Sequence, residues 1–272
     1  MADGELRAMR LRYSDECCVC SVELPAGSFA HYDAVTRSVT CSPCVSPAAA
    51  DIHIAPGVAG GSAQREFDRR RAKRVRETHE KHPKIGKFLL AIRDDPQSTK
   101  AWATGARGEE QVGRALDAIS EPGLHVLHDR RIPRSRANID HIVIAPSGVH
   151  VIDAKKYRGR PRLESTGGLF SPRVHTLFVG SRNCTSLVDG VLKQVSLVRA
   201  VLERGGYADI PTAGHLCFVD ADWPMFGGAF SISDVSVTWP QKLSATLVAD
   251  GVIDEPTSMA ISRHLAATFP SA

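Results

Sequence analysis

The stretch NIDHIVIAPSGVHVIDAKKYRG, residues 138 to 159, constrains the fold more than any other part of the sequence. Two runs of Ile and Val flank a Pro-Ser-Gly segment, a pattern that predicts two β-strands joined by a tight turn. If Ala145 lies opposite Gly148, then Asp140 lies opposite Asp153. Facing residues in a sheet have Cβ atoms about 5 Å apart. The sequence therefore predicts two neighbouring carboxylates within an apolar hairpin.

Two negative charges at this distance repel one another, and a cation between them relieves the repulsion. Lys155 follows Asp153 by two residues, so its side chain leaves the strand on the same face. A divalent cation with oxygen ligands would supply further positive charge. The hairpin thus predicts a metal site formed by Asp140 and Asp153 beside Lys155. Acidic residues at strand ends are also commonly solvated, so the pattern alone leaves both interpretations open.

Two helical segments place polar side chains on faces that are otherwise apolar. In GEEQVGRAL, Glu109 precedes Val112 and Leu116 by three and seven residues and shares their face, whereas Glu110 falls on the polar face. Gln194 lies on the apolar face of a later amphipathic helix. A buried carboxylate or amide needs a partner, and an active site offers one.

These motifs together resemble the NERD family, the nuclease-related domain. The resemblance rests on G-x-x-G-E at residues 105 to 109, the hairpin, and the helix that carries Gln194, and it covers roughly residues 100 to 215. The family is assigned to the PD-(D/E)XK nuclease superfamily. The resemblance implies an α/β fold with a restriction-endonuclease-like mixed β-sheet flanked by helices.

The resemblance also implies a chemistry, metal-assisted hydrolysis of phosphodiester bonds. Asp140 and Asp153 match the residues that hold Mg²⁺ or Mn²⁺, with Asp153 standing where the family more often has glutamate. Lys155 matches the lysine that orients the attacking water and stabilises the developing negative charge. Glu109 would complete the metal shell or relay a proton, and Gln194 would position a metal-bound water or a phosphate.

Basic residues gather in three places, one of them the segment RRIPRSR just before the hairpin, although the net charge of the whole chain is only +4. From residue 64 to residue 93 there are 11 Lys and Arg against 4 Asp and Glu, which leaves 7 positive charges on a predicted helical segment. Directly after the hairpin come four predicted nucleic-acid contacts: Lys156, Arg158, Arg160 and Arg162. Clusters of this kind favour a polyanionic partner, while a solvated helix face is the alternative for residues 64 to 93.

Two Cys-x-x-Cys pairs near the N-terminus predict a structural zinc site. The pairs are separated by 20 residues, a spacing typical of four-cysteine zinc modules: Cys17, Cys20, Cys41 and Cys44. This segment has few large apolar residues, so a bound metal would be needed to hold it folded. Reduced cysteines in a flexible tail are the alternative, and Cys18 is a spare thiol beside the first pair.

Three regions are expected: a zinc-ribbon-like module at residues 1–50, a linker and basic helical segment at 51–100, and a NERD nuclease-like domain with a C-terminal extension at 101–272. No apolar run reaches the roughly 18 residues of a membrane span, and the N-terminus lacks the apolar core of a signal peptide. We therefore expect a cytoplasmic protein with no membrane partner. Nothing in the sequence predicts an oligomeric state.

The function expected from the sequence is that of a metal-dependent nuclease acting on nucleic acid, with DNA as the expected substrate. Two alternatives remain. One is a non-catalytic nucleic-acid-binding protein on a nuclease fold, and the other is a zinc-dependent interaction protein. The first alternative would bind nucleic acid without cleaving it, and the second would show no salt-dependent affinity for nucleic acid.

Overall fold

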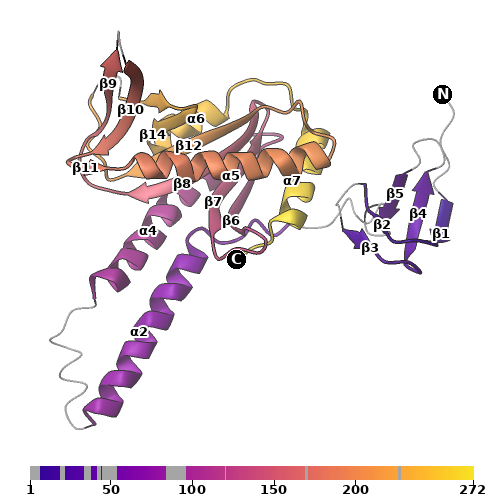
Figure 1. Cartoon of the computed structure of the whole chain (residues 1–272), viewed down its shortest axis with the longest axis horizontal. Helices are drawn as coiled ribbons and strands as arrows, with labels where there is room; N and C mark the ends of the chain where they lie inside the picture. The colour runs from indigo at the N-terminus through magenta and orange to yellow at the C-terminus, as the bar shows by residue number, and fades with distance from the viewer. Residues whose placement is uncertain are drawn as a thin grey trace.

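A six-stranded mixed β-sheet forms the centre of the protein (Figure 1). The computed structural model describes residues 7–18, 22–33, 38–41, 44, 54–83, 96–119, 121–168, 171–225 and 228–272. The strand order is β13-β14-β12-β8-β7-β6. The strands are β6 (His125–Arg131), β7 (Asn138–Ala145), β8 (Gly148–Lys156), β12 (Thr212–Val219), β13 (Phe230–Ile232) and β14 (Val235–Thr238). Strands β6, β7 and β8 form an antiparallel meander, whereas β8, β12 and β14 run parallel.

The predicted hairpin register is confirmed along the paired part of β7 and β8. Ala145 lies opposite Gly148 and His141 lies opposite Ile152. Asp140 and Asp153 are the next residues on the two strands, at the open end of the hairpin. A slip of one residue would turn every apolar side chain of the hairpin to the wrong face, and this is why the pattern fixed the register.

Helices cover both faces of the sheet, as the sequence predicted. They are α4 (Gln97–Asp117), α5 (Thr185–Arg204), α6 (Pro240–Leu247) and α7 (Glu255–Thr268). One apolar cluster joins α4 and α6 to residues such as Val143, Ile152 and Cys217. The other joins α5 and α7 to the alternate residues of the same strands, such as Ile142, Val151 and Leu216. This period of two is that of strands buried on both sides.

A long basic helix, α2 (Gly61–Lys81), lies beside α4, and both helices extend away from the sheet (Figure 1). Its N-terminus is fixed by Asp129, a buried residue within β6. The Asp129 carboxylate accepts hydrogen bonds from the backbone N of Ser62 at 2.6 Å and from its hydroxyl at 2.8 Å. A carboxylate in this position satisfies first-turn N–H groups and complements the helix dipole. The basic helix is therefore attached to the sheet domain by a specific contact.

Part of the predicted linker also packs on the fold. The carbonyl oxygen of Pro56 accepts a hydrogen bond from the backbone N of His128 at 2.6 Å, and that of Ala55 accepts one from Arg130 at 2.6 Å. The boundary predicted between residues 100 and 101 falls inside α4, which begins at Gln97. Residues 54–60 and the first turns of α4 are thus structurally continuous with the sheet domain.

A second, three-stranded sheet follows β8 in the chain. It consists of β9 (Pro161–Gly168), β10 (Ser171–Val179) and β11 (Arg182–Asn183), in the order β11-β10-β9. From residue 162 to residue 168, every residue of β9 is exposed. Figure 1 shows this ribbon standing beside the N-terminal half of α5.

The N-terminal module consists of five short strands with a core of its own. They are β1 (Arg7–Arg10), β2 (Asp15–Glu16), β3 (Glu23–Leu24), β4 (Phe29–Asp33) and β5 (Ser38–Cys41). The core contains Leu11, Leu24, Ala30 and Val39 together with Cys17 and Cys41. The predicted fold class, a mixed α/β sheet domain preceded by a small β module, is confirmed. Within the described part of the chain, every helix is too short or too polar to cross a membrane.

Candidate active site

The structure brings together the two hairpin carboxylates and the predicted lysine. The Nζ atom of Lys155 lies 2.7 Å from Oδ1 of Asp153 and 3.7 Å from Oδ2 of Asp140. The backbone N of Ala154 donates a hydrogen bond of 2.9 Å to the same Oδ2 atom of Asp140. All three charged side chains are largely shielded from solvent, with exposed fractions of 24% for Lys155, 14% for Asp140 and 12% for Asp153.

Glu109 reaches this cluster from α4. The preceding residue, Gly108, lies against β8, since a Cβ atom at that position would be 3.0 Å from the Cβ of Lys156. This close approach, which a larger residue would disturb, brings the middle of α4 to the end of the hairpin. Glu110, by contrast, is exposed and pairs with Arg114 on the outer face of the helix, as the sequence predicted.

The cluster carries more negative than positive charge, and burial and this excess charge together raise the pKa values of two of its carboxyl groups. Burial raises the pKa of Glu109 to about 9, and repulsion from Asp140 adds to the effect. Burial likewise raises the pKa of Asp140 to about 7; Lys155 acts in the opposite direction, but repulsion from Asp153 adds to the increase. Carboxyl groups shift in this direction when their charged forms lack enough positive charge nearby. Lys155 alone does not balance the three acids.

Lys155 itself remains a cation at neutral pH. Burial would lower the pKa of this ammonium group, but Asp140 and Asp153 outweigh burial and raise it above its usual value. A lysine in this state donates hydrogen bonds and stabilises negative charge, and it does not accept a proton.

The three acids carry the type of ligand atom that a hard divalent cation takes. Carboxylate oxygens are the ligands that Mg²⁺ and Mn²⁺ prefer, and an added cation would supply the positive charge that the cluster lacks. Asp140 and Asp153 approach from adjacent strands and Glu109 from the helix above the strand end. Unlike the cysteine sulfurs of the N-terminal module, the oxygens of these three described carboxylates do not all lie within 4.8 Å of one another, so holding one ion would require them to move closer together.

Gln194 lies at the edge of this group, on α5. Its Nε2 atom is 3.4 Å from the carbonyl oxygen of Asn138, two residues before Asp140. Its Oε1 atom is buried and accepts no hydrogen bond from any residue that the structure describes. A buried amide oxygen without a donor is costly. The Gln194 side chain thus offers a free acceptor beside the start of β7.

The four basic residues predicted to contact nucleic acid fall into two groups. Lys156 points to the face opposite Lys155 and pairs with Asp220 at 2.8 Å. Arg162 pairs with Glu164 at 2.8 Å and lies over the ring of Phe178. The guanidinium groups of Arg158 and Arg160 are exposed and make no ion pair with any described residue. The structure therefore leaves these two arginines available to a partner.

Asp129 also lies near Glu109, and the sequence did not predict this position. It is 3% exposed and contributes to the raised pKa of Glu109. It also accepts a hydrogen bond of 2.9 Å from Asn138. Its partner Ser62 is 67 positions away in the chain. No local pattern could have shown this contact.

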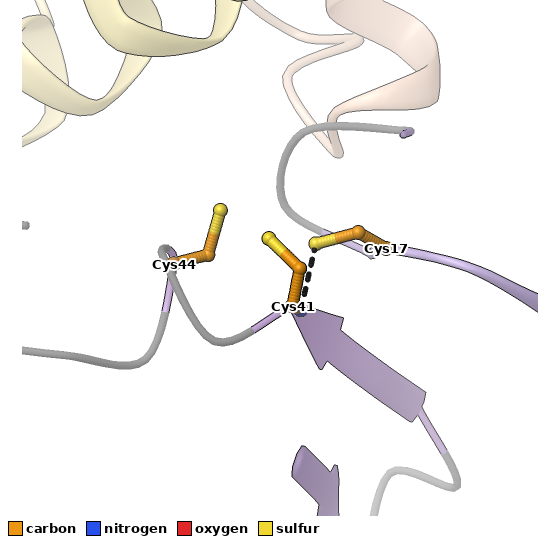
Figure 2. Close-up of side chains that lie close together, drawn as sticks. All are labelled: Cys17, Cys41 and Cys44. Carbon is orange, nitrogen blue, oxygen red and sulfur yellow. Dashed lines mark hydrogen bonds between the residues drawn. The ribbon is translucent and has the colours of Figure 1, made fainter. Parts of the chain in front are cut away.

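Three of the four predicted zinc ligands converge in the N-terminal module (Figure 2). The Sγ atoms of Cys17, Cys41 and Cys44 all lie within 4.8 Å of one another. The backbone N of Cys41 donates a hydrogen bond of 3.2 Å to the sulfur of Cys17. Sulfur atoms around a tetrahedral zinc ion are about 3.8 Å apart, given Zn–S bonds of about 2.3 Å. The cysteine group could therefore hold a metal ion such as zinc.

Cys20, the fourth predicted ligand, lies outside the described residues. Cys18 is exposed, and its sulfur is 3.3 Å from the hydroxyl of Thr40. It is not part of the converging group. The structure thus separates the spare thiol from the predicted ligand Cys17.

The raised pKa of Glu109 predicts a pH-dependent stability. The folded protein retains a proton that the unfolded chain releases, so the stabilisation is complete below pH about 4.5 and is lost as the pH rises towards 9. In magnesium-free buffer, raising the pH from 5 to 8 should therefore lower the unfolding free energy of wild type by on the order of 3 kcal/mol more than that of Glu109→Gln. Chemical denaturation at the two pH values measures this, with the exposed Glu110→Gln as control. Equal pH dependence in wild type and Glu109→Gln would contradict the burial of this charge.

Comparison with known families places the cluster in a recognised domain. Residues 104–219 match the family model NERD, described as Nuclease-related domain. The matched segment runs from α4 to the end of β12 and includes every predicted residue of the cluster: Glu109, Asp140, Asp153, Lys155 and Gln194. Comparisons with curated proteins and with solved structures give no match. The chain therefore contains a nuclease-related domain of the NERD family at residues 104–219.

Proposed function

We propose that this protein is a metal-dependent nuclease that hydrolyses phosphodiester bonds of nucleic acid, with DNA as the expected substrate. The observation that carries the proposal is the cluster of Asp140, Asp153 and Glu109 around Lys155 within a nuclease-related domain. A protein that only bound nucleic acid would gain nothing from three largely shielded carboxylates beside the phosphates. Carboxylates alone would repel the phosphates, whereas a metal ion bound to the carboxylates would attract them.

In this proposal each residue of the cluster has a role that its surroundings support. A bound Mg²⁺ or Mn²⁺ would polarise the phosphate and lower the pKa of a water molecule. Asp140 and Asp153 would hold the ion, with Glu109 completing the site or relaying a proton. The Lys155 ammonium, which stays charged, would stabilise negative charge on the phosphate oxygens in the transition state. The free Oε1 atom of Gln194 would orient water.

The cysteine group has a structural role in this proposal. Cys17, Cys41 and Cys44, with Cys20 as fourth ligand, would hold one zinc ion. A closed site with four thiolates leaves no position for a substrate, so the ion would stabilise the module and take no part in the reaction. The protein would therefore use two metals for two purposes.

Exposed arginines provide a test of nucleic-acid binding that does not require cleavage. Each phosphate contact contributes about 0.9 to the slope of log affinity against log salt for duplex DNA. The double variant Arg158→Ala, Arg160→Ala should therefore lower this slope by up to about 2. The matched control is Arg204→Ala, at the exposed end of α5 about 15 Å from Gln194. A slope that does not change would show that these arginines do not contact phosphates.

The direct test is cleavage of labelled single-stranded and double-stranded DNA and RNA. Cleavage should occur with Mg²⁺ or Mn²⁺, should stop when these ions are omitted, and should be absent in Asp153→Ala. Omitting the ions is preferable to adding a strong chelator, because a chelator would also remove zinc. Salt-dependent binding without cleavage, equal in both proteins, would support a non-catalytic binding protein instead. Absence of any salt-dependent binding would leave a zinc-dependent interaction protein.

A further inference from the structure

A cleft of about 430 Å³ opens at the carboxyl ends of β12 and β14. Residues at the end of β12, including Phe218 and Asp220, form one wall, and Trp223 and Trp239 form another. Gln111 and Arg114 of α4 complete the lining. In sheets of this type, ligands bind in the crevice outside the carboxyl ends of parallel strands.

The cleft is adjacent to the carboxylate cluster. In the parallel pairing of β8 with β12, Phe218 lies opposite Lys155 and Val219 lies opposite Lys156. Neighbouring strands are about 4.8 Å apart, so the cleft begins one strand away from the lysine of the cluster. Lys156 points to the face opposite Lys155 and lies at the cleft itself, because its Nζ is 2.8 Å from Asp220 and donates a hydrogen bond of 2.8 Å to Gln111.

The chemistry of the lining suits a flat ring with a polar edge. The rings of Trp223 and Trp239 have centroids 4.9 Å apart and are tilted by 45°, so together they form an aromatic wall. The guanidinium of Arg114 and the amide nitrogen of Gln111 provide hydrogen-bond donors around the cleft, while Gln111 Oε1 accepts from Lys156. Lys156 balances the charge of Asp220, so the carboxylate does not repel a polyanion.

We propose that this cleft binds one unpaired nucleobase of the substrate, from a nucleotide next to the phosphate held at the carboxylate cluster. Because the two indole rings already contact one another, the base stacks on the outer side of the pair. A base in an intact duplex is already stacked, so the cleft selects single-stranded or locally opened nucleic acid. This inference rests on the proposed function, since it takes the nucleotide from the substrate of the same site.

Tryptophan fluorescence tests the cleft without altering it. The chain has 3 tryptophans, and Trp102 lies on α4 away from the cleft. In the full-length Trp102→Phe variant, the remaining emission comes from the two cleft residues. Adenosine 5′-monophosphate, added without divalent metal, should quench this emission saturably. If adenosine 5′-monophosphate does not quench the emission, the inference is wrong, whatever the results with variants of Trp239.

A second measurement separates base recognition from phosphate binding. The probes are a short oligodeoxyadenylate and a strand of equal length built from abasic sugars. Trp239→Ala should weaken binding of the first about tenfold, because stacking contributes about 1–3 kcal/mol per base, and should leave binding of the second unchanged. Trp239→Phe, which retains a ring, should bind both nearly as the parent does.

The outcomes distinguish this inference from the proposed function. If both strands bind equally well, or if Trp239→Ala weakens both alike, the cleft does not hold a base and the inference is wrong, while the nuclease proposal stands. If neither strand binds in a salt-dependent manner, the proposed function fails, and the inference about its substrate fails with it. Saturable quenching, together with base-dependent affinity that Trp239→Ala removes, supports the inference.

Discussion

Replacement of Asp140 by asparagine should lower metal-dependent cleavage by at least about a thousandfold, since metal coordination contributes several kcal/mol to the transition state. The asparagine side chain keeps an oxygen that can accept the hydrogen bond from the backbone N of Ala154. It removes one of the charges that meet at the strand end, so a divalent ion loses a ligand and much of its attraction. The fold loses no apolar contact, and repulsion of Glu109 decreases.

The experiment compares the rate constant at saturating Mg²⁺ with the thermal midpoint of the same preparations. Asp140→Asn should melt at or above the wild-type temperature in magnesium-free buffer, while its cleavage disappears. Asp209→Asn is the matched control, because Asp209 is exposed in the loop before β12. Activity of Asp140→Asn within about tenfold of wild type would remove Asp140 from the proposed metal site.

Replacement of Cys41 by serine should unfold the N-terminal module and leave the sheet domain intact. Structural zinc contributes roughly 10–16 kcal/mol to folding in small modules, as much as the whole stability of a typical domain. The module buries few apolar side chains besides its cysteines. Burial of these residues alone would not balance the conformational entropy of the segment.

Zinc content and limited proteolysis measure this effect. Wild type should contain about one zinc ion per chain, and Cys41→Ser should contain none and be cleaved within residues 7–44. Cys18→Ser is the matched control, because Cys18 lies outside the converging group. Cys20→Ser should behave as Cys41→Ser does if Cys20 is the fourth ligand. A zinc-free wild-type module that resists protease would refute the metal site.

Local patterns predicted the parts of the fold that depend on neighbouring residues. The hairpin could be recognised because two apolar runs flank a single Pro-Ser-Gly turn, and a turn centred on Pro146 and Ser147 gives the register that the structure shows. Helix α5 could be recognised because its apolar residues recur at the helical period and it ends at paired glycines. The clustering of Asp140, Asp153 and Lys155 follows from this register, and the position of Glu109 follows from the helical period.

Contacts between distant segments could not be predicted in this way. Helix α4 begins at Gln97, well before its predicted glycine-rich part, because its first turns pack against α2. Helix α6 has only 8 residues, too few to show a period. The parallel pairing of β8 with β12 depends on tertiary packing, since α5 connects the two regions. The cleft beside Trp223 and Trp239 arises from that pairing, so it appears only in the structure.

Helix α4 connects the basic helix mechanically to the carboxylate cluster. Its outer turns contact α2, where Arg70 lies over the ring of Trp102 at 5.5 Å. Further along the same helix, Ala106 abuts Gly60, and the next turn carries Glu109. Because α4 is continuous from Gln97 to Asp117, one helix carries both the contacts with α2 and the carboxylate of Glu109. The surface that presents the basic residues of α2 and the carboxylate cluster therefore share a single structural support.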